Sequence, residues 1–318
     1  MRRTLEVESG GGRPGNEGGG RRLAALLVAA LLALPAADAS AANGFDANRF
    51  QAPPLPADGL TLQRPGTIEA GTFSGALTLS YANDPLVIEE ALERGVIRSQ
   101  TVISDQLWGY LSAGYGLTKN IAAHVILPVS IHQEGNPSGT DFSSSLHSAA
   151  VGDLGVGGRL RLFGGTPTSS FGAAVDGVLF IPTGSREAFA SDGKLRFRGT
   201  LIAEAVPSSL FITANVGVLT RPEIEVVETI TANMLQVNLA AGVRTSTDWL
   251  RIGLETNLQT PFGDNEGTGF ETLLVGALSL WGLNASVGVG PGFGDGAGTP
   301  DYRVVARLGW STPASDPR

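Results

Sequence analysis

The chain has 318 residues and a formal net charge of −8, and it contains 44 glycines and no cysteine. The acidic balance argues against nucleic acid as a partner, because phosphate binding needs a basic face. The lack of cysteine excludes disulfides, thiolate metal sites, cysteine nucleophiles and a lipid-anchored cysteine. The high glycine content favours strands and loops over a helical protein.

The first element in chain order has the features of an export sequence. Arg21 and Arg22 precede an apolar run over residues 23–34, and an Ala-x-Ala site follows at residues 39–41. This order predicts that residues 1–41 form an amino-terminal extension and a signal peptide removed during Sec-type export. The apolar run is too short for a transmembrane helix, and no later run approaches about twenty apolar residues.

Residues 42–71 are rich in Pro, Ala, Asn and Gly and have no sustained hydrophobic period. We assign them to a periplasmic lead-in that precedes the main domain. Two interpretations stay open for this segment. It lines or plugs the entrance of a lumen, or it is a plain flexible tail, and the composition favours the tail.

A strict alternation of side chains begins at about Thr72 and continues to Trp310. Residues 73, 75, 77, 79 and 81 are Phe, Gly, Leu, Leu and Tyr, whereas the residues between them are small or polar. A strand sends successive side chains to opposite faces, so one face is apolar and the other is not. A period of two sustained over this length argues against a helical bundle.

The alternation predicts a closed antiparallel transmembrane β-barrel of about 12 strands over residues 72–310, followed by a tail over residues 311–318. The predicted strands are residues 72–81, 102–116, 121–131, 153–163, 170–181, 196–206, 210–219, 233–245, 249–259, 270–280, 283–290 and 301–310.

The predicted connections alternate in length. The short ones are residues 117–120, 164–169, 207–209, 246–248 and 281–282. The longer ones are residues 82–101, 132–152, 182–195, 220–232, 261–269 and 291–300. Outer-membrane barrels have short periplasmic turns and longer external loops, so this alternation predicts that both termini lie in the periplasm.

A soluble β-sandwich also alternates and is the main fold-level alternative. Three features favour the membrane barrel: arginines and carboxylates share a face with glycine and serine, strand lengths suit a tilted crossing, and aromatics lie near strand ends. The aromatic residues predicted at the membrane interface are Tyr81, Trp108, Tyr115, Trp249, Trp281 and Trp310.

The inward face predicted by the alternation carries charged residues. The candidates for lining the lumen are Arg159, Arg161, Asp176, Arg198, Glu204, Arg244, Arg251, Glu255, Arg303 and Arg307. One interpretation is a polar pore with a slightly cationic lining that prefers anions. The other is a network of ion pairs that fills a small barrel and conducts little, since isolated charges in a narrow lumen are costly.

Several turn and loop motifs resemble a known family. They include residues 44–50, Asn83-Asp84-Pro85 within residues 79–86, Gly114-Tyr115-Gly116, residues 151–154 and the glycine-rich residues 290–300. The chain resembles the amino-terminal barrel of large OmpA-like outer-membrane proteins of myxobacteria and related Gram-negative bacteria. In that family repeats or a peptidoglycan-binding domain often follow the barrel. This sequence stops at residue 318, so a cell-wall tether is not carried over.

The last predicted strand resembles the terminal signal by which bacterial barrels are recognised during assembly. The resemblance therefore implies the barrel-assembly machinery as a transient partner during insertion. Outer-membrane lipid and lipopolysaccharide are the other expected partners, in the outer membrane of a Gram-negative bacterium. No oligomeric state is assigned.

Catalytic and metal-binding patterns are weak. The three histidines, His124, His132 and His147, do not pair with a serine as a membrane phospholipase requires. The acidic loop residues lack the spacing of a calcium-binding loop. We therefore expect no enzyme activity, no cofactor and no metal site.

Two functional classes follow from this sequence. The first is a passive pore or channel for small solutes, which are either polar or anionic, or apolar molecules that leave through a lateral gap. The alternative is a non-conducting structural or surface-display anchor of the cell envelope.

Overall fold

The computed structural model describes residues 45–92, 96–136, 149–166, 168–222, 224–226, 229–231, 233–262 and 267–312. The predicted signal peptide over residues 1–41 and most of the predicted tail lie outside the described residues. The strands are β1 Phe73–Leu92, β2 Val96–Gly116, β3 Ile121–Glu134, β4 Ala150–Val151, β5 Leu154–Gly164, β6 Phe171–Ile181, β7 Arg196–Ala205, β8 Leu210–Thr220, β9 Ile224–Val226, β10 Thr229–Thr231, β11 Met234–Arg244, β12 Leu250–Pro261, β13 Gly269–Leu280, β14 Leu283–Phe293 and β15 Tyr302–Ser311.

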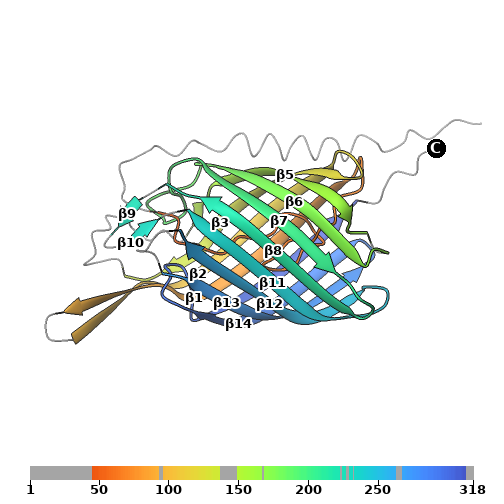
Figure 1. Cartoon of the computed structure of the whole chain (residues 1–318). Coiled ribbons are helices and arrows are strands. Elements are labelled where there is room, and N and C mark those ends of the chain that lie inside the picture. Colours follow the sequence, from red (N-terminus) through yellow and green to blue (C-terminus); the bar gives the residue numbers. More distant parts are fainter. Residues whose placement is uncertain are drawn as a thin grey trace, which may run out of the picture. The chain divides into compact units, whose positions relative to one another are not determined.

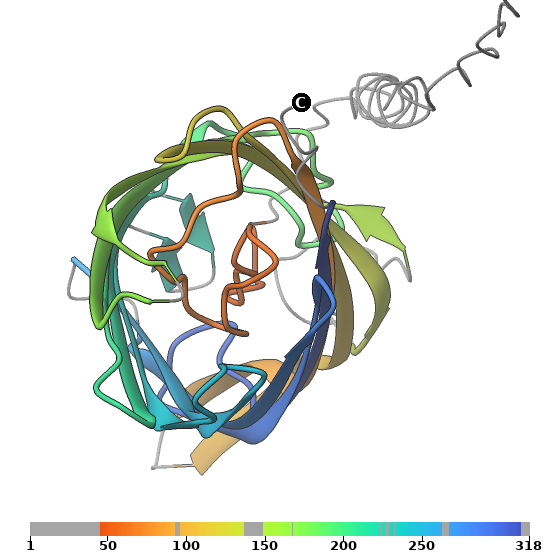
Figure 2. The same cartoon turned by 90° about the vertical axis from the view of Figure 1, so that its right-hand side faces the viewer.

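The sheet closes on itself. Thirteen strands form one sheet, and without the two-residue strand β4 the remaining twelve form a ring (Figures 1 and 2). Strand β1 pairs antiparallel with β2 on one side and with β15 on the other, so the ring has no open edge. The predicted closed antiparallel barrel of twelve strands is confirmed. Closure matters physically because an open edge in lipid would leave backbone N–H and C=O groups without partners.

The first hairpin is longer than predicted. Residues 82–101 were expected to form a loop, but β1 and β2 remain paired through Leu92 and Val96. The register shifts between Asn83 and Leu86, and Asp84 adopts a φ of 48°. A β-bulge thus absorbs the turn residues that would otherwise end the strand. Short strands also lie in two other predicted loops, namely β4 in residues 132–152 and the β9–β10 hairpin in residues 220–232.

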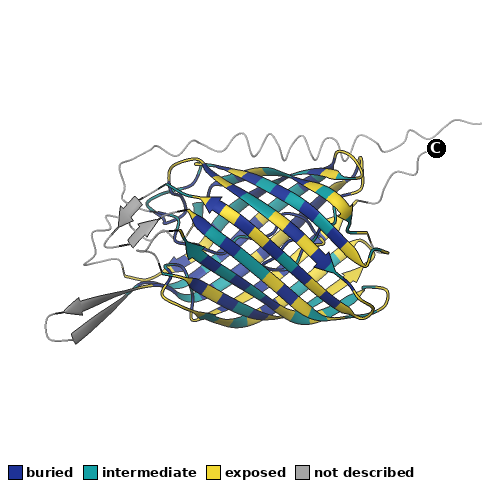
Figure 3. Ribbon diagram, viewed as in Figure 1, coloured by how far each residue is buried: buried dark blue, intermediate teal, exposed yellow. Residues whose placement is uncertain are grey.

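The outer wall is apolar. More exposed and less exposed residues alternate along much of the described wall, giving a diagonal pattern around the barrel (Figure 3). The outward residues include Leu111, Leu201, Ile212, Leu254 and Leu274, all of them exposed. A continuous apolar surface of this kind requires lipid instead of water around it. No helix among the described residues is long and apolar enough to cross a membrane.

A charged side chain placed on the lipid-facing wall should destabilise the barrel. Leu201 lies midway along β7 with 63% of its surface exposed, and replacement by arginine should destabilise the barrel in phospholipid vesicles by about 2–4 kcal/mol. Leu210, at the turn end of β8, is the matched control, with an expected cost of about 0–1 kcal/mol for the same change. Urea titration with heat-dependent gel mobility as readout measures both. Equal effects at the two positions would contradict a membrane-spanning wall.

Most of the predicted interface aromatics lie on the outside. Trp249, Trp281 and Trp310 are exposed near the short turns. Tyr115 points outward there and contacts Phe73, with ring centroids 4.6 Å apart. Tyr81 lies on the outward face of β1, towards the long loops, and donates a hydrogen bond to Asp105.

The prediction for Trp108 was wrong. It is 2% exposed and lies inside the barrel, where its ring centroid is 6.4 Å from that of Tyr110. The reason is its parity along β2. Trp108 alternates in phase with Gln106, which is also buried, so proximity to a strand end does not decide its face.

The lead-in runs inside the barrel. Residue 45, the first described residue, lies among the long loops, where Asp46 and Ala47 bond to loop 182–195. The chain then passes down the lumen and reaches the short turns, where Thr67 bonds to Lys119 (Figure 2). The expected periplasmic tail is therefore not observed. The apolar side chains of the lead-in explain why this segment lies inside the barrel, because a tail in water would leave them all exposed.

Candidate functional site

We call residues 45–68 the plug. Its apolar side chains are buried against the inner wall, with Phe50 and Leu60 packed in one cluster with Tyr110 and Leu273. Leu62 packs in a second cluster near the short turns, and Leu55 and Ile68 in a third. The plug thus supplies much of the apolar interior of a barrel whose wall is largely polar on the inside.

Side chains of the wall form hydrogen bonds to the backbone of the plug. Asn215 brackets residue 63, accepting from the Gln63 N–H at 2.6 Å and donating to its carbonyl at 2.9 Å. Glu255 accepts hydrogen bonds from the N–H groups of Leu60 and Thr61, at 2.9 and 2.8 Å. A Cβ at Gly59 would collide with this carboxylate, so the close approach requires glycine. An irregular segment inside a barrel needs such partners, since its polar groups have no strand ladder.

One ion-pair cluster lies midway along the plug. Arg159 donates to both oxygens of Asp58 at 2.7 and 3.0 Å, and to Asp176 at 3.1 Å. His124 Nε2 lies 3.1 Å from Oδ2 of Asp176, the same oxygen that accepts the hydrogen bond from Arg159. All four side chains are almost fully buried. The cluster therefore joins the plug to three strands through buried charges, whose separation would be costly.

A second cluster lies near the short turns. Arg64 of the plug and Arg251 of β12 both contact the carboxylate of Glu204, at 3.0 and 2.8 Å. Arg251 also bonds to Asp248, and Arg244 lies 3.9 Å from Asp248. Burial opposes the charged form of Asp248, but Arg251 and its neighbouring arginines lower the pKa of that carboxyl below its usual value.

A third cluster lies near the long loops. Asp46 of the plug, Asp153 and Asp192 all contact Arg196, at 2.8, 2.9 and 3.3 Å, and Arg221 bonds to Asp192. Burial raises the pKa of Asp153 to about 6 against the opposing effect of Arg196. Burial also acts on Asp192, but Arg221 and Arg196 outweigh it and lower its pKa to about 2. Three carboxylates therefore share two guanidinium groups, and Asp153 is held less firmly in its charged form than Asp192.

The remaining predicted lumen residues lie on the inner face or at its mouth. Arg303 makes a two-point ion pair with Glu271, at 2.5 and 3.0 Å. Arg307 donates to the plug carbonyls of Pro53 and Leu55. Arg161 is at the short-turn mouth, where it bonds to Asn120.

Sequence reasoning missed several residues of these clusters. Asp46, Asp58 and Arg64 belong to the lead-in, and His124 and Arg196 lie on the inner wall. A usable pattern was present for the plug, because large apolar residues recur through residues 45–68 between the charged ones. A solvated tail rarely combines regularly spaced large apolar residues with charged residues.

The inner wall is net cationic. Within the described strands, eight arginines face the lumen or its mouth together with four carboxylates. The arginines are Arg159, Arg161, Arg196, Arg198, Arg244, Arg251, Arg303 and Arg307, and the carboxylates are Asp176, Glu204, Glu255 and Glu271. The plug itself carries two aspartates and two arginines, so it does not change this balance.

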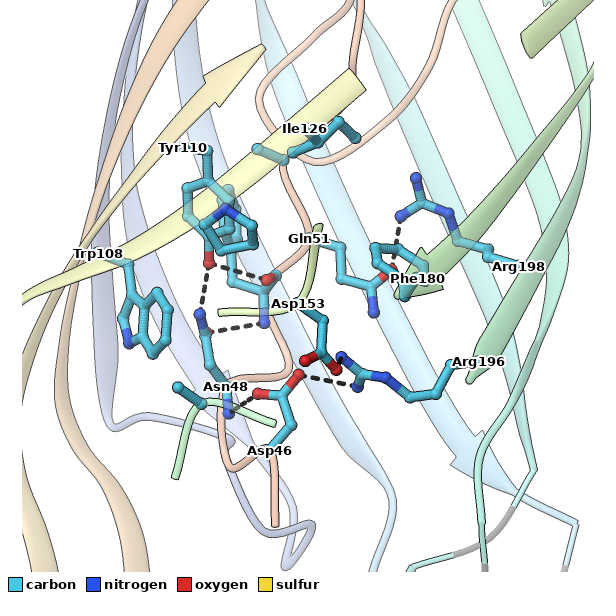
Figure 4. A pocket seen from close by; sticks show the side chains of 14 residues that line it. Asp46, Asn48, Gln51, Trp108, Tyr110, Ile126, Asp153, Phe180, Arg196 and Arg198 are labelled. Carbon is cyan, nitrogen blue, oxygen red and sulfur yellow. Dashed lines mark hydrogen bonds and ion pairs between the residues drawn. The ribbon is translucent and has the colours of Figure 1, made fainter. Parts of the chain in front are cut away.

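Empty space remains between the plug and the wall. One cavity near the long loops is lined by aromatic rings and by Arg196 and Arg198 (Figure 4). A second is lined mostly by amide and hydroxyl side chains, and Arg198 and Gln51 border both. A third lies near the short turns beside Arg64 and Arg251. The plug therefore obstructs the lumen without filling it.

The fold is similar to that of a solved outer-membrane protein, and the matches to two others are weaker. An outer membrane channel from Pseudomonas putida F1 has a TM-score of 0.57 at 11% identity, and the match covers 78% of this chain and 97% of that one. LpxR from Salmonella typhimurium has a TM-score of 0.39 at 8% identity, with 74% of this chain and 99% of that one covered. OmpF from Salmonella typhi, in complex with daunomycin, has a TM-score of 0.33 at 8% identity, with 76% and 97% covered.

No curated protein sequence matches the chain. A family model does match it, over residues 94–294, which is more than half of the sequence. The matched region contains most of the barrel strands and the wall and loop residues of all three ion-pair clusters. The chain therefore belongs to the family described as "Putative MetA-pathway of phenol degradation", and it has the fold of an outer-membrane β-barrel.

Proposed function

We propose that this protein is an outer-membrane channel for small solutes whose lumen is closed by its own plug in the conformation described above. The observation that carries the proposal is that the plug is a separate, irregular segment held only by non-covalent contacts, with cavities beside it. The barrel has twelve strands and is therefore wider than the eight-stranded barrels whose wall side chains alone fill the interior, so a lumen is expected once the plug has moved.

The charge of the wall and the family description indicate the chemical class of the solute. On the described strands, eight arginines against four carboxylates favour the passage of anions over cations once the plug has moved. The family description refers to phenol degradation, which favours small aromatic compounds as solutes. The proposal assigns transport to the barrel and no catalysis, and the similarity to an outer membrane channel supports that choice.

The proposal includes the route by which the chain reaches its membrane. Sec-type export followed by insertion through the barrel-assembly machinery is expected, with lipid and lipopolysaccharide around the apolar wall. The likeness of several turn motifs to OmpA-like barrels of myxobacteria remains a prediction beside the family assignment.

A removable tether tests whether solute flux depends on plug movement. The chain has no cysteine, so a pair introduced as Gln63→Cys and Asn215→Cys is the only disulfide that can form. The Asn215 side chain bonds to both backbone groups of residue 63, so the two positions are neighbours across the contact between plug and wall. Liposome swelling with small organic anions should be normal for the reduced pair and should fall sharply on oxidation.

The single variant Gln63→Cys serves as the control and should not respond to oxidation. If neither the unmodified chain nor a chain that lacks residues 45–66 gives swelling or ion conductance in a bilayer while gel mobility shows both to be folded, the channel is excluded. The structural or surface-display anchor would then be the better assignment.

A further inference from the structure

The cavity near the long loops combines aromatic rings with a guanidinium group that has unused donors. Trp108 and Tyr110 of β2 lie on one side, and Arg196 and Arg198 of β7 lie on the other beside Phe180 of β6 (Figure 4). Both arginines lie over the Phe180 ring, with 5.4 and 5.6 Å from each guanidinium carbon to the ring centroid.

The two arginines have opposite surroundings. Arg196 contacts the three carboxylates Asp46, Asp153 and Asp192. Arg198 makes no ion pair within the described part of the chain, and its hydrogen bond there runs from Nη1 to Gln51 Oε1 at 2.5 Å. It is nevertheless 6% exposed, and its Nε and Nη2 groups are buried without a partner among the described residues.

These two nitrogen atoms form one edge of the guanidinium group. Nε–H and Nη2–H point in parallel directions, which is the arrangement that binds a carboxylate through two hydrogen bonds. Burying such donors without an acceptor is costly, so an edge left open beside a cavity indicates a ligand site. The neighbouring carboxylates do not compete for it, because Asp46 and Asp153 are engaged by Arg196.

We propose that this cavity binds a small planar aromatic carboxylate, with the carboxylate on the Nε–Nη2 edge of Arg198 and the ring against Trp108, Tyr110 and Phe180. The inference rests on the proposed channel function and names the class of solute that the channel holds. Ile126 and Pro128 complete an apolar lining around the ring. A simple inorganic anion would leave these rings and apolar groups without a partner.

Binding can be measured on the folded full barrel by the fluorescence of Trp108. The chain has four tryptophans, so changing Trp249, Trp281 and Trp310 to Phe leaves Trp108 as the single probe. Benzoate should change this fluorescence in a saturable way. Benzamide, which has the same shape without the charge, and acetate, which has the charge without the ring, should bind at least roughly tenfold more weakly.

The variants assign the effect to Arg198. Arg198→Gln should weaken benzoate binding roughly tenfold or more, and Arg198→Lys should weaken it as well, because lysine keeps the charge but loses the two-point edge. Arg161→Gln, at the short-turn mouth, is the matched control and should bind benzoate normally. Heat-dependent gel mobility shows whether each variant is folded, and the Lys variant keeps the test valid if the Gln variant is not.

Other outcomes overturn the inference in distinct ways. Equal binding of benzamide and benzoate would indicate a site for neutral rings, and equal binding of acetate would indicate a general anion site. No response to benzoate would exclude the site. Binding is measured without transport, so the site and the channel can fail separately. Benzoate binding by a chain that passes no solute would disprove the channel and support the site. Solute flux without benzoate binding would support the channel and disprove the site.

Discussion

A chain that lacks residues 45–66 should form discrete, anion-selective conductance steps in a planar bilayer, with a conductance several-fold above that of the intact chain. The plug occupies the lumen from the long loops to the short turns, so its removal leaves a continuous water-filled path. On the described strands eight arginines and four carboxylates then line that path or its mouth, and Arg221, Asp153, Asp192 and Asp248 lie in the adjoining loops and turns. Anions should carry most of the current, which the reversal potential in a salt gradient measures directly.

The shortened chain should still fold, because the strands pair with each other and not with the plug. The wall arginines that lose a plug partner, such as Arg159 and Arg307, would be hydrated by the water that enters. Glu255→Gln in the full chain is a milder version that weakens the hold on residues 60 and 61 and should cause brief openings. Glu69→Gln, outside the plug, is its control.

A folded, shortened chain that stays silent would show that the wall side chains themselves close the barrel. A shortened chain with cation-selective steps would contradict the charge argument while leaving the plug argument intact. The two parts of this prediction can therefore fail separately.

Replacing Arg159 with methionine should lower the free energy of unfolding by about 3–5 kcal/mol, the usual cost of removing one partner from a buried ion pair. The change leaves Asp58 and Asp176 buried without their shared guanidinium partner. It also removes hydrogen bonds to the carbonyls of Arg64 and Gly66. Urea unfolding in phospholipid vesicles, followed by tryptophan fluorescence and gel mobility, measures the loss.

Arg161→Met is the matched control on the same strand. Arg161 is partly exposed and bonds to Asn120, with no carboxylate partner among the described residues, so about 1 kcal/mol or less is expected. Adding Asp58→Asn and Asp176→Asn to Arg159→Met should restore part of the lost stability, because no buried charge then remains unpaired. Similar losses for the two arginines, or no recovery in the triple variant, would show that the cluster does not hold the plug.

Periodicity along the chain carried most of the information about the wall. In β15, residues 302, 304, 306, 308 and 310 are apolar and face outward, while Arg303 and Arg307 face inward. The facing of these residues follows from the alternation of side chains along a single strand. It can therefore be predicted without knowing which strands pair. Trp108 shows the limit of looser rules, since its position near a strand end suggested the interface and its parity placed it inside.

The first hairpin shows a second limit. Asn83, Asp84 and Pro85 are turn formers, and on local preference they end a strand. In the barrel the pairing of β1 with β2 resumes beyond them through a bulge, because the neighbouring strand supplies partners for the chain on the far side. Pairing between strands therefore overrode the local preference.

The sequence by itself determined the barrel: twelve strands, an apolar outer face, a polar inner face rich in arginine, and connections of alternating length. All of these are local or periodic properties. Only the tertiary structure decided that residues 45–68 fill the lumen and which charges meet there. Asp58 and Arg159 are 101 positions apart, and Gln63 and Asn215 are 152 apart. These residues become neighbours only when the sheet closes, because closure brings distant side chains around the plug. The buried polar groups of the plug need hydrogen-bond partners, and these side chains supply them.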